Sequence, residues 1–418
     1  MNNYAVIGKL KLQEIEGAKT LQMGFYDGMP FAVQKDLTED DLCIIFLPDG
    51  QLSKEYAEAN DCVQRIDENG NRAGGFFGKN RKVRSVKFMQ GKIRSLGYVA
   101  KIDTLAFTGL SIDELSKLKE GQFISDLNGV PIANKFINQA TRSAMGGQKG
   151  IRKERELLGL KMHPDTSQYY QNKTNFKPGD LVTWTEKLDG TSVRFGEVYD
   201  ERKLNWAQRL LNKITPLEKY QKKFVTGTRR VLLSEDKRDT GFYENDNIYK
   251  GLTKSCDGKL HQGEAVYAEI VGWQSPEKPL FERGGVKFTY GCQPGERTLF
   301  VYKIVWTLPG GEQTTLSWDA TKARATELGL KYVPELGVRK FGNDAKPEGV
   351  IGVVEKLTAN YTIGLSTLDQ SHIREGCAIR VDRGQDTFIY KSKSEEYYML
   401  EDVFKADDKN VDLEEAQG

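Results

Sequence analysis

Short runs of Val, Ile and aromatic residues, separated by turn residues, fill the first hundred positions of the chain. The runs that predict β-strands are 4–12, 21–26, 31–33, 42–46, 83–88 and 97–102. Asp27-Gly28 and Asp49-Gly50 lie between such runs and are typical of tight turns. Short strands at this spacing predict a small β-barrel, for which an OB-like fold is the leading expectation.

The pattern changes after residue 110. Ser111, followed three residues later by Glu114, has the form of a capping box and predicts the start of a helix. Residues 134–180 are more polar, and we interpret them as helix, linker and turn.

A β-rich pattern returns from about residue 181 and continues to 393, interrupted by a predicted helical insertion at 204–224. Ser394 then has the place of an N-cap for a last helix, 394–404, before a frayed tail. We therefore expect an α+β chain divided into 1–110 (barrel), 111–180 (helical segment and linker), 181–393 (main domain) and 394–418 (C-terminal helix and acidic tail).

The net charge of +2 hides an uneven distribution of charge. One block has no acidic residue and holds these cations: Arg72, Lys79, Arg81, Lys82, Arg84, Lys87, Lys92 and Arg94. Such a block suits a polyanion, so we expect these side chains to bind nucleic acid. The last 25 residues are acidic instead.

Other features narrow the class of protein. The five cysteines are scattered and form no CxxC pair, which argues against a disulfide framework or a structural zinc site. No apolar run is long enough to span a membrane, and the first residues lack the pattern of a signal peptide. We therefore expect a soluble, cytoplasmic protein with no membrane partner.

The tetrad Lys187-Leu188-Asp189-Gly190 follows an apolar strand. A lysine amine held near a phosphate can attack phosphorus once it has lost its proton, and a carboxylate two residues later can place a metal or bind a ribose hydroxyl. The alternative interpretation is a strand end with a surface Lys-Asp pair.

The segment Glu186-Lys187-Leu188-Asp189-Gly190 resembles motif I, KxDG, of the covalent nucleotidyltransferases, which comprise DNA ligases, RNA ligases and mRNA capping enzymes. Further segments resemble the other motifs in the same order. They are 226–230 (motif Ia), 266–272 (III), 299–304 (IIIa), 372–380 (IV) and 388–393 (V). The resemblance covers about half of the chain, from 181 to 393, and implies a nucleotidyltransferase (ATP-grasp-like, DNA/RNA ligase type) domain with antiparallel sheets.

The resemblance implies a role for each motif residue. Lys187 would be the catalytic nucleophile, and Glu375, Glu269 and Asp189 would hold Mg²⁺ or Mn²⁺. The nucleotide would be bound by Glu186, Asp189, Gly190, Arg229, Glu269, Tyr302, Lys391 and Lys393. For stacking on the purine Phe300 is the second choice after Tyr302, and Arg230 is the alternative to Arg229. Each of these residues also has a structural interpretation: a core aromatic, a carboxylate paired with a cation, or a solvated strand face.

Two residues that differ from the common motif pattern, together with the order of the domains, distinguish the branches of the superfamily. Ser192 stands where DNA ligases and capping enzymes commonly have arginine, and Lys303 stands where an acid is frequent. Only 25 residues follow Lys393, too few for the OB domain that those enzymes carry after motif V. A strand-rich domain ahead of the catalytic one, and the segment His163-Pro164-Asp165-Thr166, resemble an RNA-repair branch of RNA ligases instead.

The resemblance implies an ATP-dependent RNA ligase that joins a 3′-hydroxyl to a 5′-phosphate through lysyl-AMP and an adenylylated 5′ end. The implied partner is RNA with such ends, as in a nicked duplex, and we expect a monomer. A DNA ligase or a GTP-dependent capping-type enzyme is the alternative, and a nucleic-acid-binding protein with an inactive catalytic fold is a third possibility.

Overall fold

The computed structural model describes residues 4–406 except 67, 69–71, 90–92, 147–154, 203, 205, 207, 209–212, 216–217, 235–242, 244–245 and 385. The chain divides into two compact units, Met1–Asn138 and Gln139–Gly418. That division differs from the expected boundary at residue 110, because strand β14, which lies beyond it, pairs with strand β6. None of the helices in the described residues is both long and apolar enough to cross a bilayer.

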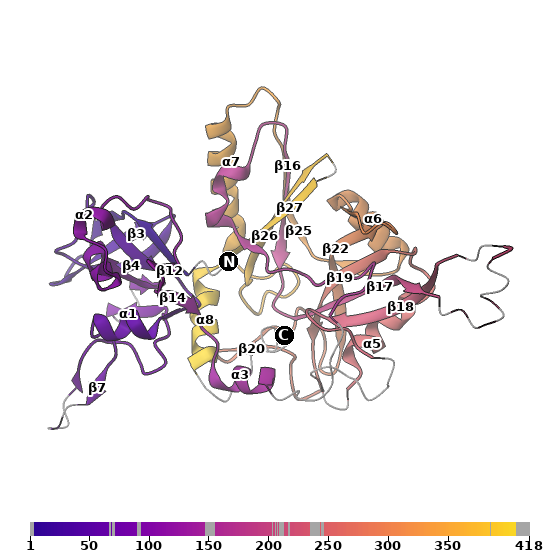
Figure 1. Ribbon diagram of the computed structural model, residues 1–418, viewed down its shortest axis with the longest axis horizontal. Coiled ribbons are helices and arrows are strands. Elements are labelled where there is room, and N and C mark those ends of the chain that lie inside the picture. Colours follow the sequence, from indigo (N-terminus) through magenta and orange to yellow (C-terminus); the bar gives the residue numbers. More distant parts are fainter. Residues whose placement is uncertain are drawn as a thin grey trace. The chain divides into compact units, whose positions relative to one another are not determined.

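The N-terminal unit consists mainly of short antiparallel strands (Figure 1). The strands are β1 Ala5–Gly8, β2 Lys11–Glu14, β3 Leu21–Tyr26, β4 Met29–Gln34, β5 Cys43–Phe46, β6 Gly50–Leu52, β7 Arg65–Ile66, β8 Arg72–Ala73, β9 Val86–Phe88, β10 Ile93–Ser95, β11 Tyr98–Lys101, β12 Asp126–Leu127, β13 Val130–Pro131 and β14 Ala133–Lys135. The larger sheets run β1-β5-β11 and β2-β3-β4, and the remaining strands form two-stranded pairs.

The predicted strands 21–26, 31–33, 42–46 and 97–102 are present as β3, β4, β5 and β11. The predicted strand 4–12 divides into β1 and β2 of different sheets, and only 86–88 of the predicted strand 83–88 is strand, as β9. Helix α2, Ile112–Leu115, begins at Ser111 with the predicted capping box, in which Ser111 and Glu114 satisfy each other's backbone N–H groups. Helix α1, Lys54–Ala59, and the 3-10 helix η2, Ile102–Thr108, complete the unit. The strand pairs of the described residues do not close into a barrel, so the OB-like fold is not confirmed.

The second unit is built on two sheets. Its strands are β15 Ser167–Gln168, β16 Leu181–Lys187, β17 Thr191–Glu201, β18 Tyr220–Thr228, β19 Glu264–Gly272, β20 Glu282–Arg283, β21 Val286–Lys287, β22 Arg297–Thr307, β23 Gln313–Thr315, β24 Lys331–Tyr332, β25 Glu335–Lys340, β26 Gly376–Arg383 and β27 Asp386–Lys393. One sheet runs β15-β27-β26-β16-β25, and the other runs β18-β17-β19-β22-β23 with β24 parallel to β22. Antiparallel pairing dominates both sheets, as expected for this domain.

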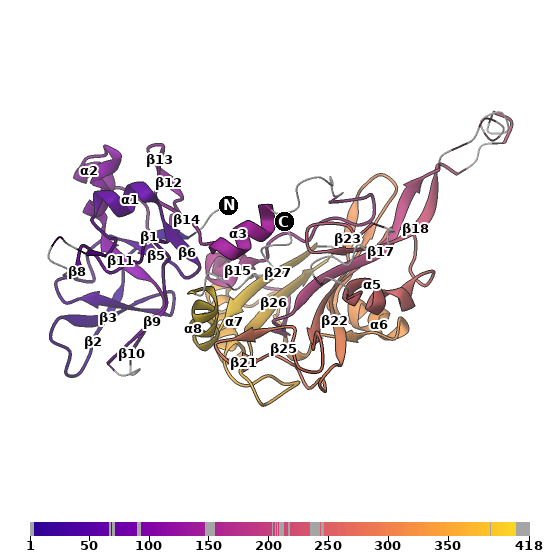
Figure 2. The ribbon, with the colours of Figure 1, turned by 90° about the horizontal axis from the view of Figure 1, so that it is seen from below.

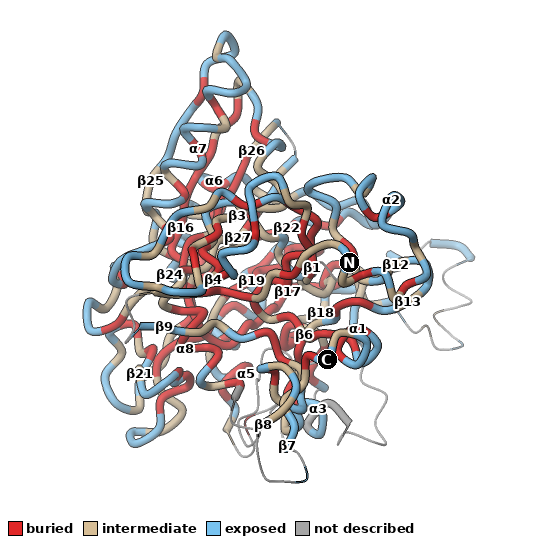
Figure 3. Tube along the Cα trace, turned by 90° about the vertical axis from the view of Figure 1, so that its left-hand side faces the viewer, coloured by how far each residue is buried: buried red, intermediate tan, exposed pale blue. Residues whose placement is uncertain are grey.

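The helices of this unit are α3 Gln139–Gly146, η3 Tyr169–Gln171, η4 Lys173–Asn175, α5 Ile248–Thr253, η5 Lys254–Cys256, α6 Trp318–Glu327, α7 Pro347–Thr362 and α8 Glu395–Ala406. Helix α7 packs on the first sheet through Val350 and Val354, which share a core with Trp184 of β16. Figure 3 shows that buried residues follow the central strands. The central strands are therefore held from their flanks.

The predicted helix at 204–224 is wrong at its C-terminal end. Tyr220–Thr228 is strand β18, which pairs along its full length with β17 as a long hairpin (Figure 2). Tyr220 and Phe224 flank Gln221, Lys222 and Lys223, and their cross-strand pairing to Glu201 and Glu197 decides the conformation. The predicted C-terminal helix is confirmed: α8 begins after Ser394, whose hydroxyl accepts a hydrogen bond from the Tyr397 N–H at 3.1 Å.

Candidate active site

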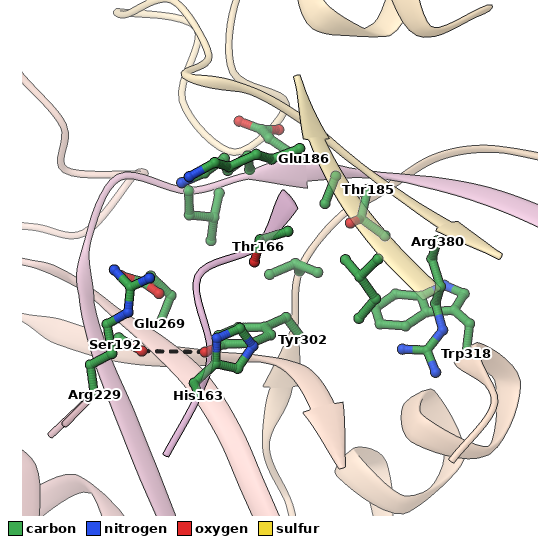
Figure 4. Close-up of a pocket in the computed structure, with 16 residues that line it drawn as sticks. His163, Thr166, Thr185, Glu186, Ser192, Arg229, Glu269, Tyr302, Trp318 and Arg380 are labelled. Carbon is green, nitrogen blue, oxygen red and sulfur yellow. Dashed lines mark hydrogen bonds between the residues drawn. The ribbon is translucent and has the colours of Figure 1, made fainter. Parts of the chain in front are cut away.

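A pocket lies between the two sheets of the second unit (Figure 4). The first sheet contributes Thr185, Glu186, Lys187, Ala378, Arg380, Ile389 and Lys391 to its lining, and the second contributes Ser192, Glu269 and Tyr302. The lining is completed by His163, Thr166, Leu188, Arg229, Trp318 and Val333. Five of the predicted nucleotide-binding residues, with the predicted nucleophile, thus line one pocket.

Lys187 is the last residue of β16, and the turn after it is unusually close to the second sheet. A Cβ on Gly190 would lie 2.5 Å from the carbonyl oxygen of Ile270 and 2.8 Å from Cγ of Glu269. Only glycine therefore allows the chain to pass from β16 into β17 here. This close approach places the turn after Lys187 against Glu269 of the opposite sheet.

The Lys187 ammonium group pairs with Glu375, at 2.7 Å between Nζ and Oε2. Lys393 approaches the other oxygen of the same carboxylate, at 3.4 Å between Nζ and Oε1. Burial raises the pKa of Glu375 above its ordinary value, while the two ammonium groups act in the opposite direction. The structure therefore brings the predicted nucleophile, a predicted metal acid and one motif V lysine into direct contact.

Tyr302 owes its position to an irregularity in the second sheet. Tyr267 pairs with Lys303 and Ala268 pairs with Val301, so Tyr302 is left over as a β-bulge residue. A bulge redirects a side chain, and Tyr302 faces the pocket, where its hydroxyl lies 3.2 Å from the Ser192 hydroxyl. Ser192, the residue that departs from the arginine of other branches, is thus a partner of the predicted stacking ring (Figure 4).

Glu186 has one carboxylate oxygen that lacks a partner in the part of the chain that the structure describes. Its Oε2 accepts hydrogen bonds from the N–H group and the hydroxyl of Thr367, with the N–H at 2.9 Å. Its Oε1 is buried and has no hydrogen-bond partner among the described residues. In Figure 4 the carboxylate points to the opposite side of its strand from Tyr302 and Glu269.

The remaining predicted residues differ in their surroundings. Arg229 lines the pocket and forms an ion pair with Asp165, and Glu269 also lines it. Asp189 lies outside the lining and accepts two hydrogen bonds from Arg283, at 3.1 Å from Nε and 3.4 Å from Nη2. Lys391 faces the pocket, whereas Lys393 lies among acids behind it.

The metal acids do not form a ready-made cage. Within the described ranges, no group of three or more His, Cys, Asp and Glu side chains is arranged to hold a metal ion. Mg²⁺ commonly uses one or two carboxylates together with water and substrate phosphates, so such an arrangement still fits a metal that arrives with a nucleotide.

Four residues that contact the predicted ones carry no motif and were not predicted: Arg283, Tyr290, Thr367 and Glu401. The Asp189 N–H donates to the Tyr290 hydroxyl at 2.5 Å, and Glu401 lies 3.0 Å from the Lys393 ammonium group. These contacts join distant parts of the sequence. Glu401 belongs to the predicted helix 394–404 and to the acidic last 25 residues, but its side chain is buried.

The predicted nucleic-acid-binding block lies in the N-terminal unit. Lys79, Arg84 and Lys87 are exposed, and Arg94 stands directly across from Lys87 in the β9–β10 pair. Arg81 donates to the Leu52 carbonyl at 3.1 Å. The Arg72 side chain and the whole of Lys92 lie outside the described residues.

Lys82 differs from the rest of the block. Its side chain is buried, with the ammonium group 5.3 Å from the centre of the Phe136 ring. A buried cation over an aromatic ring is held within the unit, so it is not a surface contact for a phosphate. We therefore remove Lys82 from the expected nucleic-acid-binding set.

The same fold is found in a solved RNA ligase. A variant of the Naegleria gruberi RNA ligase with AMP and Mn is 15% identical, with a TM-score of 0.59, and the match covers 95% of this chain and 98% of that one. A variant without ligand (16%, TM-score 0.58, 95% and 97%) and a variant with ATP and Mn (16%, TM-score 0.55, 95% and 97%) give similar results. At this level of identity the likeness shows a shared fold.

Sequence comparison shows the family. No curated protein is similar enough in sequence to count as a relative. The RNA ligase family model, in contrast, matches residues 180–393, which is half of the chain and the same range that carries the six motifs. The expected family is confirmed: this chain belongs to the RNA ligase family, enzymes that join RNA ends.

Proposed function

We propose that this RNA ligase uses ATP and that Lys187 is its covalent nucleophile. The observation that carries the proposal is the Lys187–Glu375 ion pair at the edge of a pocket that also presents Arg229, Lys391 and Tyr302. The Lys187 amine attacks the α-phosphorus of ATP, a P–N bond forms, and pyrophosphate leaves. AMP then passes to the RNA 5′-phosphate, and the 3′-hydroxyl finally attacks that phosphate and releases AMP.

The pocket supports a bound adenine nucleotide. Tyr302 offers a ring for stacking on the base, and its hydroxyl is held by the Ser192 hydroxyl. Arg229 and Lys391 supply positive charge for the phosphates. The similar Naegleria structures with ATP or AMP support the same choice of nucleotide.

Glu269 and Glu375 are the acids best placed to hold Mg²⁺ or Mn²⁺, since Glu269 lines the pocket and Glu375 contacts Lys187. A divalent cation there would neutralise phosphate charge and favour the neutral form of the lysine. Asp189 is engaged with Arg283, so we propose that it orients the turn of motif I and reaches a metal only when that pair opens. The Naegleria structures with Mn support a divalent metal.

The N-terminal unit is proposed to bind RNA through phosphate contacts of its basic block, with Lys82 excluded. Exposed lysine and arginine side chains on short strands and turns can contact the phosphates of a duplex backbone. An OB-like domain would bind nucleic acid in the same way. A nicked duplex, as met in RNA repair, is the proposed substrate. The monomeric state and the cytoplasmic location remain predictions, to be checked by light scattering and by imaging of a tagged protein.

The decisive test is the nucleophile. The Lys187→Ala variant should form no adduct with α-labelled ATP, because it lacks the amine that forms the P–N bond with AMP. It should still seal a nick whose 5′ end is already adenylylated, since that substrate bypasses the lysine. Lys356→Ala, on the exposed face of α7, is the matched control and should behave as the wild type.

The outcomes separate the alternatives. An adduct in the Lys187→Ala variant would place the nucleophile elsewhere. An adduct with GTP in place of ATP would indicate capping-type chemistry, and sealing of nicked DNA in preference to RNA would contradict the proposed substrate.

A further inference from the structure

Helix α8 lies beyond the part of the chain matched by the RNA ligase family, 180–393, yet it packs against β20 of the second unit (Figure 1). A surface helix normally turns its charged residues toward solvent. In α8 the opposite holds for Glu401 and Lys405, which are both buried. Buried charges need partners, and here the partners lead toward the active site.

A series of ion pairs of alternating sign runs from the nucleophile to this helix. Lys187 contacts Glu375 at 2.7 Å, and Glu375 contacts Lys393 at 3.4 Å. Lys393 then contacts Glu401 at 3.0 Å, and Glu401 contacts Lys405 at 3.0 Å. Glu401 is therefore two contacts away from the proposed metal acid and does not line the nucleotide pocket.

The same helix reaches the other motif acid through a second cation. The Phe404 ring centre lies 4.2 Å from the Arg283 guanidinium group, and Arg283 pairs with Asp189 of motif I. Between the two routes lies the buried ring of Tyr397, whose centre is 5.1 Å from the Lys393 ammonium group. One face of α8 thus contacts both Lys393 and Arg283, the two cations that pair with Glu375 and Asp189.

We propose that α8 is a positioning element of the adenylylation site, in which Glu401 holds the Lys393 ammonium group where it shares Glu375 with Lys187. The proposal rests on the proposed function, since it concerns the formation of lysyl-AMP at Lys187. It assigns a role to residues that lie outside the family match and outside all six motifs.

The physical reason lies in the flexibility of lysine. A lysine side chain has several rotatable bonds, and its ammonium group can serve any nearby acceptor. With Glu375 alone as partner, Lys393 could take both carboxylate oxygens and displace Lys187. Glu401 binds Lys393 from the opposite side and leaves one oxygen of Glu375 to the nucleophile. Buried ion pairs add little net stability, so fixing this geometry is a better account of their presence than stabilisation.

The test compares two substitutions in the full chain. Glu401→Gln keeps the shape of the side chain and removes its charge, whereas Glu401→Asp keeps the charge and shortens the side chain. We expect lysyl-AMP formation to slow ten- to a hundredfold in Glu401→Gln and less than fivefold in Glu401→Asp. Glu348→Gln, which changes an exposed acid at the start of α7, is the charge-matched control and should match the wild type.

Thermal unfolding of each variant separates positioning from packing. If Glu401 only filled space, Glu401→Gln would retain wild-type adenylylation, or the rates of both variants would follow their melting temperatures. Either result overturns the proposal. The proposal is supported if Glu401→Gln is slow and the double variant Glu401→Gln/Lys405→Met regains the wild-type melting temperature but not the rate. The second change balances the buried charge, but it does not restore the partner that holds Lys393.

Failure of this inference is distinct from failure of the proposed function. If Lys187→Ala abolishes the adduct and Glu401→Gln forms it at the wild-type rate, α8 has no positioning role and the nucleophile stands. If Lys187→Ala still forms the adduct, the proposed function itself is wrong.

Discussion

At the scale of single residues, the two proposed metal acids of this site, Glu375 and Glu269, differ in burial. Glu375 is buried between two ammonium groups, whereas Glu269 faces the pocket from the opposite sheet. Removing one partner of a buried ion pair leaves an uncompensated charge and is expected to destabilise a protein by about 3–5 kcal/mol. Glu269 is less buried than Glu375, so the penalty for changing it should be smaller. Substituting the two acids should therefore lower the free energy of unfolding by different amounts, even if both take part in catalysis.

The first prediction uses this difference. Glu375→Gln should lower both lysyl-AMP formation, by about a hundredfold, and the free energy of unfolding. Glu269→Gln should lower lysyl-AMP formation to a similar degree while the free energy of unfolding stays within about 0.5 kcal/mol of the wild type. The measurements are single-turnover labelling with ATP and urea unfolding. Near-normal labelling in both variants would mean that these are structural carboxylates.

His163 gives a second prediction, for pH dependence. Burial, with the nearby charges of Lys303 and Arg229, lowers the pKa of His163 from 6.5 to about 3. The folded protein thus keeps the ring neutral where the unfolded chain takes up a proton. The resulting contribution to stability is complete above pH 6.5 and is lost as the pH falls toward 3.

The variant His163→Phe should flatten that dependence. The phenyl ring can keep the edge-to-face contacts with Tyr267 and Tyr302, whose ring centres lie 5.5 Å and 5.4 Å from the His163 ring. Urea unfolding between pH 3 and 7 should show a shallower loss of stability in the variant. Identical slopes in the two proteins, or an NMR titration of His163 near its ordinary pKa, would contradict the assignment.

Much of the site was predictable at this scale because the motifs combine residue type with spacing. Lys187, Glu269, Tyr302 and Lys391 were each found in the pocket where their motif implied. Arg283 and Glu401 were not, because nothing in their local sequence distinguishes them from ordinary surface charges. Their roles depend on contacts with Asp189 and Lys393 that only the folded chain creates.

At the scale of elements, the β-rich pattern expected for 181–393 agrees with the long strands that carry motifs, β16, β19, β22 and β27. The failure at 204–224 has a clear cause. The segment is rich in Lys and Leu, which favour helices, but pairing with β17 determines the conformation of its end. Propensity is a weak guide where a neighbouring strand offers a full ladder of hydrogen bonds.

The third prediction concerns the turn between β16 and β17. Gly190→Ala places a methyl group against the Ile270 carbonyl and Glu269, so the two sheets must separate slightly. We expect a loss of stability of about 1–3 kcal/mol and a marked fall in lysyl-AMP formation, since Lys187 and Glu269 move apart. Thermal unfolding and ATP labelling measure the two effects.

The control for this change is Gly349→Ala in helix α7. A Cβ at Gly349 meets nothing within 4 Å, and alanine is the better helix former, so this variant should be slightly stabilised and fully active. If Gly190→Ala matched Gly349→Ala in both measurements, the close approach of the turn to the second sheet would contribute neither to stability nor to lysyl-AMP formation.

At the scale of the whole molecule, the division of the chain at residue 138 separates the two proposed tasks. All residues assigned to nucleotide chemistry lie in the second unit, and the exposed basic residues Lys79, Arg84 and Lys87 lie in the first. The sequence located this separation through charge and motif positions, although it placed the boundary differently. Each unit has its own buried core, which favours independent folding.

The last prediction follows from that separation. A chain of residues 139–418 should still form lysyl-AMP at Lys187, because its pocket needs nothing from the first unit. Its affinity for a nicked duplex should be weaker, and the slope of log affinity against log salt should become shallower by about one unit for each phosphate that the shorter chain no longer binds. Changing Lys79, Arg84 and Lys87 together to Gln in the full chain should reproduce most of that change in salt dependence without removing the unit. The preference for RNA sequence should stay unchanged, since contacts with phosphates carry no sequence information.

If the N-terminal unit served stability alone, the truncated chain would lose adenylylation and sealing together and circular dichroism would show it poorly folded. A well-folded truncation, or a triple variant, that binds and seals nicked RNA as the full chain does would contradict the RNA-binding role.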